Sequence, residues 1–301
     1  MRARPYVRVI IAIAGFAVAA AGAVAAVGYS SNNADCSMPD RDQFQRARDS
    51  ATAWIRANEP AVLDTENPAL WHMLREAASL SNDPYLLNLY AKYYDRYLAR
   101  NPGNVWHHLF DTNARFKIAV AGIDSWPDYG LLFMYGLTCQ DDLRNDPRVR
   151  GLMEGRACGR VGTPSYFRDP ACLTHQLMGV RFVQQSRCED RERTDALADD
   201  LVAKIGAGTQ WDFRVVDAYV QKVLMLAVSH AADRINPRWL VRILDAQQPD
   251  GGWDDFDPLI PLGAAGSAIG WCGRGLCLQR PTSNFHTTVQ GLYLAAIMAE
   301  S

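Results

Sequence analysis

Three side chains capable of acid–base chemistry lie near the starts of three similar predicted helices. They are His175, Tyr219 and His286. Histidine exchanges a proton near neutral pH, and tyrosine can share the transfer. A helix N-terminus adds partial positive charge and N–H groups that have no partner within the helix. If the three helices are equivalent, these side chains ring one mouth of a cavity and favour an anionic or carboxylate-bearing ligand. The alternative is that each caps its own helix or packs in the interior.

A second polar group lies in a turn before the last predicted helix. Asp254, Asp255 and Asp257 surround a single phenylalanine. Carboxylates in such a cluster bind a cation or act as acid and base. The other interpretation is a solvated turn in which aspartate caps the segment that follows, and we favour it.

The elements that position these residues are predicted to be helices throughout, and no segment has the pattern of a strand. Apolar residues recur with helical period over 43–57, 68–80, 84–99, 105–120, 127–139, 146–157, 171–187, 192–206, 213–231, 236–247 and 285–299. Four of these starts carry an Asp or Asn before a proline: Asp83-Pro84, Asp146-Pro147, Asp169-Pro170 and Asn236-Pro237. The Asp or Asn side chain caps the first turn, and proline lacks an N–H that this turn leaves unpaired.

Some of these helices resemble one another at a fixed spacing. Tyr85, Gly130, Gln176 and Gln221 occupy similar positions and are 45, 46 and 45 residues apart, whereas Gln290 follows after 69. This spacing indicates helix-pair repeats, each of which must stack on its neighbours to bury its apolar face. The chain has room for about six such hairpins, which are enough to close a ring. The surplus of about 24 residues before the last helix is expected to form a loop, often on the binding side.

One repeat carries a recognisable motif. Gln247-Gln-Pro-Asp-Gly-Gly-Trp253 resembles the Q-x-x-x-G-x-W repeat of squalene cyclases and protein prenyltransferases, and Phe285-His286-Thr287 resembles the aromatic-His-Thr of the same superfamily. In the motif, we expect Gln to cap the preceding helix, the glycines to make the turn and Trp to stack at the next helix. The resemblance implies an all-α fold, an α/α toroid of about six hairpins with alternating inner and outer helices.

The chemistry of that superfamily does not carry over with the fold. The D-x-D-D acid motif of the cyclases is absent, which makes isoprenoid or lipid processing the least favoured function. The prenyltransferase zinc set would correspond to Asp257, Cys272 and His286, but Cys272 is better explained by a disulfide, so we expect neither a metal nor a cofactor.

The toroid also suggests an enzyme of another class. Several polysaccharide lyases use this fold, with a Tyr/His pair that removes the proton beside a uronate carboxylate. Asn113, Arg181 or Arg214 would neutralise that carboxylate here. Our main interpretation is a protein that binds a ligand or an envelope partner in its central cavity, and a lyase-like enzyme on an acidic glycan is the alternative.

The first 28 residues are predicted to be a separate targeting segment. Arg2, Arg4 and Arg8 precede an uncharged apolar run over 9–27. Its 19 residues suffice for a membrane helix with a cytoplasmic N-terminus, whereas a cleaved signal peptide usually has a shorter core. Both interpretations place the rest outside the cytoplasm, as a linker over 29–42 and a domain over 43–301.

Cysteine content agrees with export. Cys272–Cys277, Cys158–Cys172 and Cys139–Cys188 are the expected disulfides, and Cys36 is left over. Cys172 and Cys188 flank one predicted helix, about 24 Å apart, and so cannot pair. A net charge of -2 argues against nucleic-acid binding.

Overall fold

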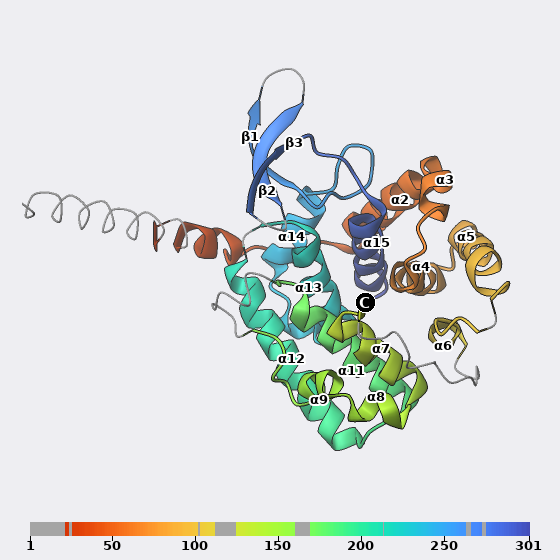
Figure 1. Cartoon of the computed structure of the whole chain (residues 1–301). Coiled ribbons are helices and arrows are strands. Elements are labelled where there is room, and N and C mark those ends of the chain that lie inside the picture. Colours follow the sequence, from red (N-terminus) through yellow and green to blue (C-terminus); the bar gives the residue numbers. More distant parts are fainter. Residues whose placement is uncertain are drawn as a thin grey trace, which may run out of the picture.

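The structure, a computed structural model, describes residues 22–23, 26–101, 103–111, 125–159, 169–212, 214–262, 266–272 and 275–301. Helices dominate it, and a small sheet projects from one side (Figure 1). The long helices are α2 (Arg41–Ala57), α4 (Pro68–Ser81), α5 (Pro84–Tyr93), α7 (Asp128–Thr138), α11 (Cys172–Ser186), α12 (Arg191–Trp211), α13 (Asp217–Val228), α14 (Pro237–Asp245) and α15 (Phe285–Glu300). Shorter ones are α3 (Glu59–Leu63), α6 (His107–Phe110), α8 (Asp141–Asn145) and α9 (Pro147–Met153), with a π-helical turn over Tyr94–Leu98 and a 3-10 turn over Ala232–Arg234.

The predicted helices are confirmed wherever apolar periodicity is sustained. The segments 43–57, 68–80, 171–187 and 285–299 match α2, α4, α11 and α15 within two residues. The segment expected over 105–120 is described only in part, as α6, because residues 112–124 lie outside the described ranges.

Three of the four predicted capping pairs act as expected. Asp83 accepts from the backbone N–H groups of Tyr85 and Leu86, and Asp146 and Asn236 accept in the same way at α9 and α14. Asp169 is the exception. The chain makes one further turn after it, and Ala171 becomes the N-cap of α11. The pairing of Asp with Pro therefore marked a turn at this position.

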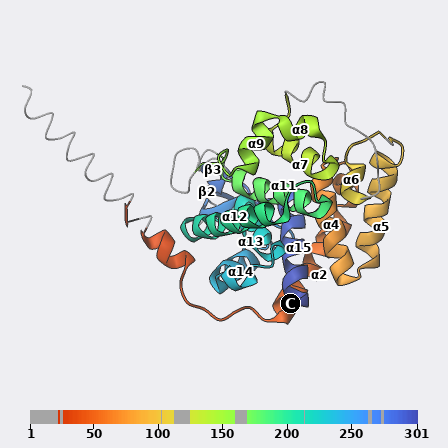
Figure 2. The same ribbon diagram turned by 90° about the horizontal axis from the view of Figure 1, so that it is seen from below.

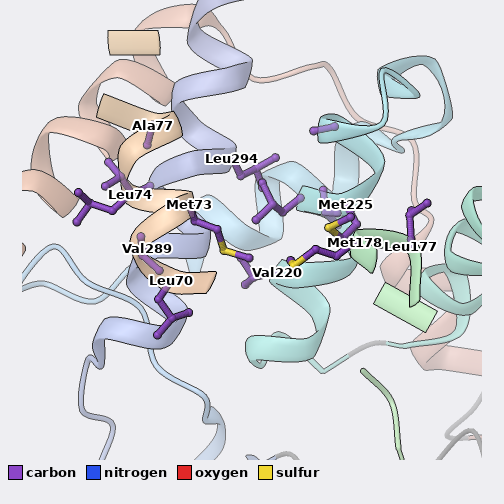
Figure 3. Close-up of a cluster of buried hydrophobic side chains, with 14 of the residues drawn as sticks. Leu70, Met73, Leu74, Ala77, Leu177, Met178, Val220, Met225, Val289 and Leu294 are labelled. Atoms are coloured by element: carbon purple, nitrogen blue, oxygen red, sulfur yellow. The ribbon is translucent and has the colours of Figure 1, made fainter. Parts of the chain in front are cut away.

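The core lies between α4, α11, α13 and α15. The C-terminal helix α15 packs against α13 on one side and against the first helices, α2 and α4, on the other, and α11 packs against α7 and α12. Figure 3 shows Met73, Val220, Met178 and Met225 meeting where these helices converge. The region between α4, α11, α13 and α15 is therefore filled by aliphatic and thioether side chains.

The expectation that the chain has no strands is wrong. β1 (Asp257–Leu262), β2 (Ser267–Cys272) and β3 (Gly275–Gln279) form an antiparallel sheet in the order β1-β2-β3. They occupy the surplus segment predicted to be a loop. Pro258 and Pro261 obscured the pattern because proline cannot donate a ladder hydrogen bond. Both prolines lie in β1, an edge strand, where one row of N–H groups needs no partner.

The Gln247–Trp253 motif joins three helices. The Gln247 amide donates to the carbonyls of Ala47 in α2 (2.9 Å) and of Gly251 in its own turn (2.8 Å). Trp253 is buried and donates from its indole to the Ile243 carbonyl near the end of α14 (2.7 Å). Trp253 therefore takes the capping role expected of Gln247, which reaches across to α2 instead, while the Trp253 ring lies against the next helix, α15, as expected.

The glycines of this motif are required for close packing. A Cβ on Gly251, whose φ is +94°, would clash with the Ser50 backbone in α2. The Trp253 ring lies against α15, where a Cβ on Gly291 would come within 2.6 Å of it. Together these contacts hold the α14 turn between the first and last helices of the body.

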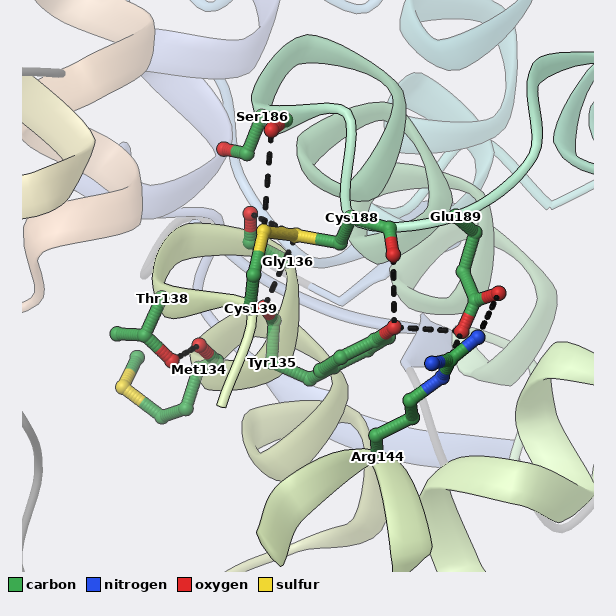
Figure 4. The surroundings of a disulfide bond; sticks show 9 residues. All are labelled: Met134, Tyr135, Gly136, Thr138, Cys139, Arg144, Ser186, Cys188 and Glu189. Carbon is green, nitrogen blue, oxygen red and sulfur yellow. Dashed lines mark hydrogen bonds and ion pairs between the residues drawn. A yellow bond between two sulfur atoms is a disulfide. The ribbon is translucent and has the colours of Figure 1, made fainter. Parts of the chain in front are cut away.

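All three expected disulfides are confirmed. Cys139–Cys188, Cys158–Cys172 and Cys272–Cys277 are paired, with Cα atoms 5.0, 5.6 and 6.2 Å apart, and Cys36 is free and exposed. Figure 4 shows the first of them beside Glu189, which accepts from the Tyr135 hydroxyl and from both arms of Arg144 (2.8 and 2.9 Å). Paired cysteines indicate an oxidising environment, extracytoplasmic or secreted.

The chain before α2 docks on the helical body. Residues 26–32 are helical. The ring of Tyr29 lies 4.5 Å from that of Trp211, and the side chain of Asn32 is fully buried. Part of the segment expected to be a linker, 29–42, is therefore fixed by tertiary contacts.

The predicted membrane run over 9–27 lies largely outside the described residues. Within the part of the chain that is described, no helix combines the length and apolar character needed to cross a bilayer.

Candidate functional site

A pocket of about 360 Å³ lies where five helices begin. Its walls come from the N-terminal halves of α4, α7, α11, α13 and α15 and from the segments before α6 and α7. The aromatic side chains in the wall are Trp106, Trp126, Tyr129, Phe133, His175 and His286. Leu70, Met73 and Met178 supply the aliphatic part. The pocket is therefore an aromatic-rich depression above the packed core.

The structure brings His175 and His286 into this one pocket, as predicted. His175 stacks on Tyr129, with ring centroids 4.3 Å apart and planes at 26°. Its Nδ1 lies 2.8 Å from the Ala171 carbonyl. Because a carbonyl only accepts, Nδ1 carries the proton, and in the neutral ring Nε2 remains an acceptor. His286 is exposed.

Burial lowers the pKa of His175 below its ordinary value. The hydrogen bond to Ala171 and the charges of Asp169 and Asp217 oppose the shift, and His286 adds to it. A histidine with a lowered pKa is neutral at pH 7. His175 thus offers an aromatic face and an acceptor nitrogen at neutral pH.

Tyr219 does not join the two histidines, which corrects the predicted ring of three. It is fully buried, and its hydroxyl donates to Oδ1 of Asn32 (2.7 Å) on another side of α13. The reason is helical phase. Tyr219 lies two residues before Gln221, which does line the pocket, and two residues correspond to roughly 200° around a helix. Burial raises the pKa of Tyr219 well above its usual range.

Several pocket residues were missed by the sequence reasoning. Gln221 is buried and accepts from the Thr174 hydroxyl (2.9 Å), which links α13 to α11 beneath the histidine. The repeat spacing had singled out Gln221 as an anchor and could have identified it. Trp126 and Tyr129 flank the start of α7, where Pro127 and Gly130 gave only a weak repeat match.

Three of the pocket helices begin without a side-chain cap. The N-cap residues of α7, α11 and α13 are Pro127, Ala171 and Val216, and no side-chain hydrogen bond from them is found at these described helix starts. The other long helices, including α4 and α15 of the pocket, all have one. First-turn N–H groups that lack a cap are available to water or to an anionic ligand.

A neighbouring cavity of about 620 Å³ shares Leu70 and His286 with the pocket. Arg280 lines it together with Asp254 and Asp255. Arg280 was not predicted as a site residue, although it lies shortly before the His286 helix in the sequence. The two hollows thus share His286 in their walls, and the larger one carries two carboxylates and one cation.

The three aspartates do not converge on one point. Asp254 is buried and accepts from the N–H groups of Asp255 (2.7 Å) and Thr282 (2.5 Å). Burial raises the pKa of Asp254 to about 6. Asp255 is exposed, whereas Asp257 accepts from the Val215 N–H (3.0 Å) at the base of the sheet. Only Asp255 is solvated as the favoured interpretation expected, because Asp254 is buried and Asp257 is half-buried.

The predicted neutralising groups lie elsewhere. Arg181 lines a different cavity, where it donates to Ser229 and Gln184. Arg214 pairs with the buried Asp212 (2.8 Å). Asn113 lies outside the described residues. The structure therefore separates Arg181 and Arg214 from the histidine pocket.

Metal ligands are likewise dispersed. Cys272 is bonded to Cys277, so it cannot complete the zinc set considered with Asp257 and His286. Across the described ranges, no group of three His, Cys, Asp or Glu side chains could hold a metal ion.

Comparisons with known proteins add no assignment. No protein-family model matches the chain, and no curated protein and no solved structure shows significant similarity to it.

Proposed function

We propose that this chain is an exported α/α-toroid protein that binds an acidic sugar, or a ligand of the same chemistry, in the pocket at the mouth of its ring. The observation that carries the proposal is the convergence of five helix starts on one aromatic-lined pocket that holds both predicted histidines. The proposal also covers an envelope protein that presents such a group to the pocket.

The toroid is supported by the order of helix contacts. The pocket helices α7, α11, α13, α15 and α4 follow one another around the core, and α2, α5, α12 and α14 pack on their outer sides (Figures 1 and 2). The last helix, α15, contacts the first two long helices, as a closed ring of hairpins requires.

The ligand class follows from the pocket's chemistry. A pyranose ring stacks on aromatic faces such as the exposed Tyr129 beside His175, because its C–H groups are apolar. A carboxylate is favoured by the uncapped starts of α7 and α11.

Binding rather than cleavage is proposed because the lyase pair is not assembled. Tyr219 is buried against Asn32, and Arg181 and Arg214 have partners outside the pocket. Isoprenoid processing is disfavoured as well, because a deep apolar barrel would be needed and Met73 and Met178 fill the centre.

For location, we propose that residues 9–27 hold the chain in the membrane with the domain outside the cytoplasm. The three disulfides support the extracytoplasmic side of this proposal. Cleavage of the same segment as a signal peptide would give a secreted or periplasmic form with the same pocket.

The proposal is tested by calorimetric titration of the chain with uronic-acid oligosaccharides and with neutral oligosaccharides of the same linkage. The acidic oligosaccharides should bind. His286→Asn should weaken their binding about tenfold or more, which is the effect of losing one charge-assisted hydrogen bond. His230→Asn is the matched control, because His230 is exposed in the cavity of Arg181. Equal binding of the neutral oligosaccharides, or no binding of any oligosaccharide, would refute the proposal. Absorbance from unsaturated products would instead favour the lyase.

A further inference from the structure

The three-stranded sheet has one face composed of apolar side chains. Residues paired across antiparallel strands lie on the same face, and alternate residues share it. Ile260 is opposite Ile269, which is opposite Leu278. One row further along, Trp271 is opposite Leu276. A continuous apolar surface therefore crosses all three strands, and we call these five residues the sheet face.

This face points away from the body. Ile260, Leu276 and Leu278 are 55%, 63% and 64% exposed. The opposite side of the sheet carries the buried Ala268 and Gly270, and a Cβ on Gly270 would clash with the ring of Phe256 beneath it. The sheet thus packs on the body through its inner side, and its outer side is exposed.

The base of the sheet lies beside the docked N-terminal segment. Asp257, the first residue of β1, accepts from the N–H of Val215, four residues after Trp211. The Trp211 ring lies 4.5 Å from the Tyr29 ring, with the two planes tilted by 40°. Figures 1 and 2 both show β2 and the N-terminal helix on the same flank, next to α12 and α14.

Apolar exposure continues from the sheet to the predicted membrane run. Val27 is 69% exposed at the end of that run, and Trp211 is 56% exposed between it and the sheet. In the sequence, Val27 ends the uncharged run of 19 residues that is long enough to cross a bilayer. Tryptophan is a residue typical of the membrane interface, and an exposed cation, Arg280, directly follows β3.

We propose that the sheet face rests on the lipid bilayer next to the membrane segment, so that the domain lies on the membrane at two points. The inference rests on the membrane location proposed above. The Cys272–Cys277 bond joins β2 to β3. A second copy of the chain, or its own residues 9–27, would be the competing occupants of the same face.

The test uses the full chain in phosphatidylcholine–phosphatidylglycerol vesicles. Cys36→Ser removes the free thiol, so Ile260→Cys introduces a single site for a nitroxide label. Leu262→Cys, on the same edge strand, is the second site if the first variant folds poorly. Leu87→Cys on α5, 40% exposed, is the matched control. Two readouts are taken: flotation of the chain with vesicles after an alkaline carbonate wash, and collision of the label with oxygen or with a water-soluble nickel chelate.

At Ile260 we expect oxygen collisions to exceed nickel collisions several-fold, with the reverse at Leu87. A chain that floats while the Ile260 label collides mainly with nickel overturns the sheet inference and leaves the membrane segment standing. A label shielded from both reagents also overturns it and assigns the face to a protein contact. A chain that does not float overturns the membrane location, and the sheet inference fails with it.

Discussion

Replacement of Asn32 by alanine should destabilise the domain far more than the same change at its neighbour. Asn32 is fully buried in the docked segment. Its amide donates to the carbonyls of Thr209 (2.7 Å) and Gln210 (3.2 Å). Its Oδ1 accepts from the Tyr219 hydroxyl (2.7 Å) and from Nη1 of Arg242 (2.5 Å). One side chain thus joins the ends of α12, α13 and α14.

The magnitude follows from the number and burial of these bonds. A buried hydrogen bond contributes about 1 kcal/mol net, and one with a charged partner contributes more. Alanine removes four bonds and leaves the buried Thr209 carbonyl and the buried Tyr219 hydroxyl without this partner, so we expect a loss of about 3 kcal/mol. In a domain of this size that corresponds to roughly 6–10 °C in melting temperature.

Asn33→Ala is the matched control. Asn33 makes one bond to the body, to the Gln210 carbonyl (2.8 Å) in an exposed position, and one to Tyr29 in its own turn. Its loss should cost less than about 1 kcal/mol. Thermal denaturation followed by circular dichroism compares the two variants, and hydrogen exchange over residues 26–33 reports whether the segment has detached.

Equal destabilisation by the two substitutions would refute the reasoning, because burial would then not set the cost. Unchanged hydrogen exchange over 26–33 in Asn32→Ala would refute it as well, since docking would not depend on this side chain.

Three further predictions concern the body of the domain. Burial lowers the pKa of His72 to about 4, so the unfolded chain binds this proton more readily than the folded chain. The stability that the neutral ring contributes should fall by up to about 3 kcal/mol as the pH drops from about 6.5 to 4. Urea denaturation should show this slope in the difference between the native chain and His72→Gln, and a pH-independent difference would contradict it. Lys222 and its partner Asp212 are both buried, 2.7 Å apart. Lys222→Met should therefore cost about 3 kcal/mol. Lys204→Met, in an exposed pair with Asp200, should cost less than about 0.5 kcal/mol, and similar costs would count against this account. Replacing Cys139 and Cys188 by serine opens a loop of 49 residues and should cost about 4 kcal/mol. The same change at Cys272 and Cys277, which are 5 apart, should cost about 2 kcal/mol. Melting of the oxidised variants tests the ranking, and a reversed order would argue against loop closure as the cause.

The helices could be predicted because local chemistry and packing agree there. Sustained apolar period and an Asp or Asn before proline both act within one or two helical turns. The sheet could not, because its strands are five or six residues long and β1 contains two prolines. Such strands are stabilised by pairing with one another and by packing on Phe256, which lies beneath Gly270. Neither contact appears as a local pattern in the sequence.

The pocket was predictable only in part for a related reason. His175 and His286 could be placed at helix starts, and the structure puts both in one wall. Whether a residue faces inward depends on its helical phase to within one position, and Tyr219 shows that similar distance from a helix start is not enough. α13 is buried on nearly every side, so its apolar residues did not mark a single inward face that would fix the phase.

The contact between the first and last helices has a topological consequence. Arg41, which begins α2, and Glu300, which ends α15, form an ion pair at 3.4 Å, so the two ends of the helical body are adjacent. A short peptide could join Ser301 to the start of α2, and a new opening could be cut in an exposed turn between other helices. The order of the hairpins along the chain would then be permuted while every neighbour in space stayed the same. The docked segment 26–33 could also be attached at a new terminus. Its contacts with the body would then no longer depend on its position in the sequence before α2.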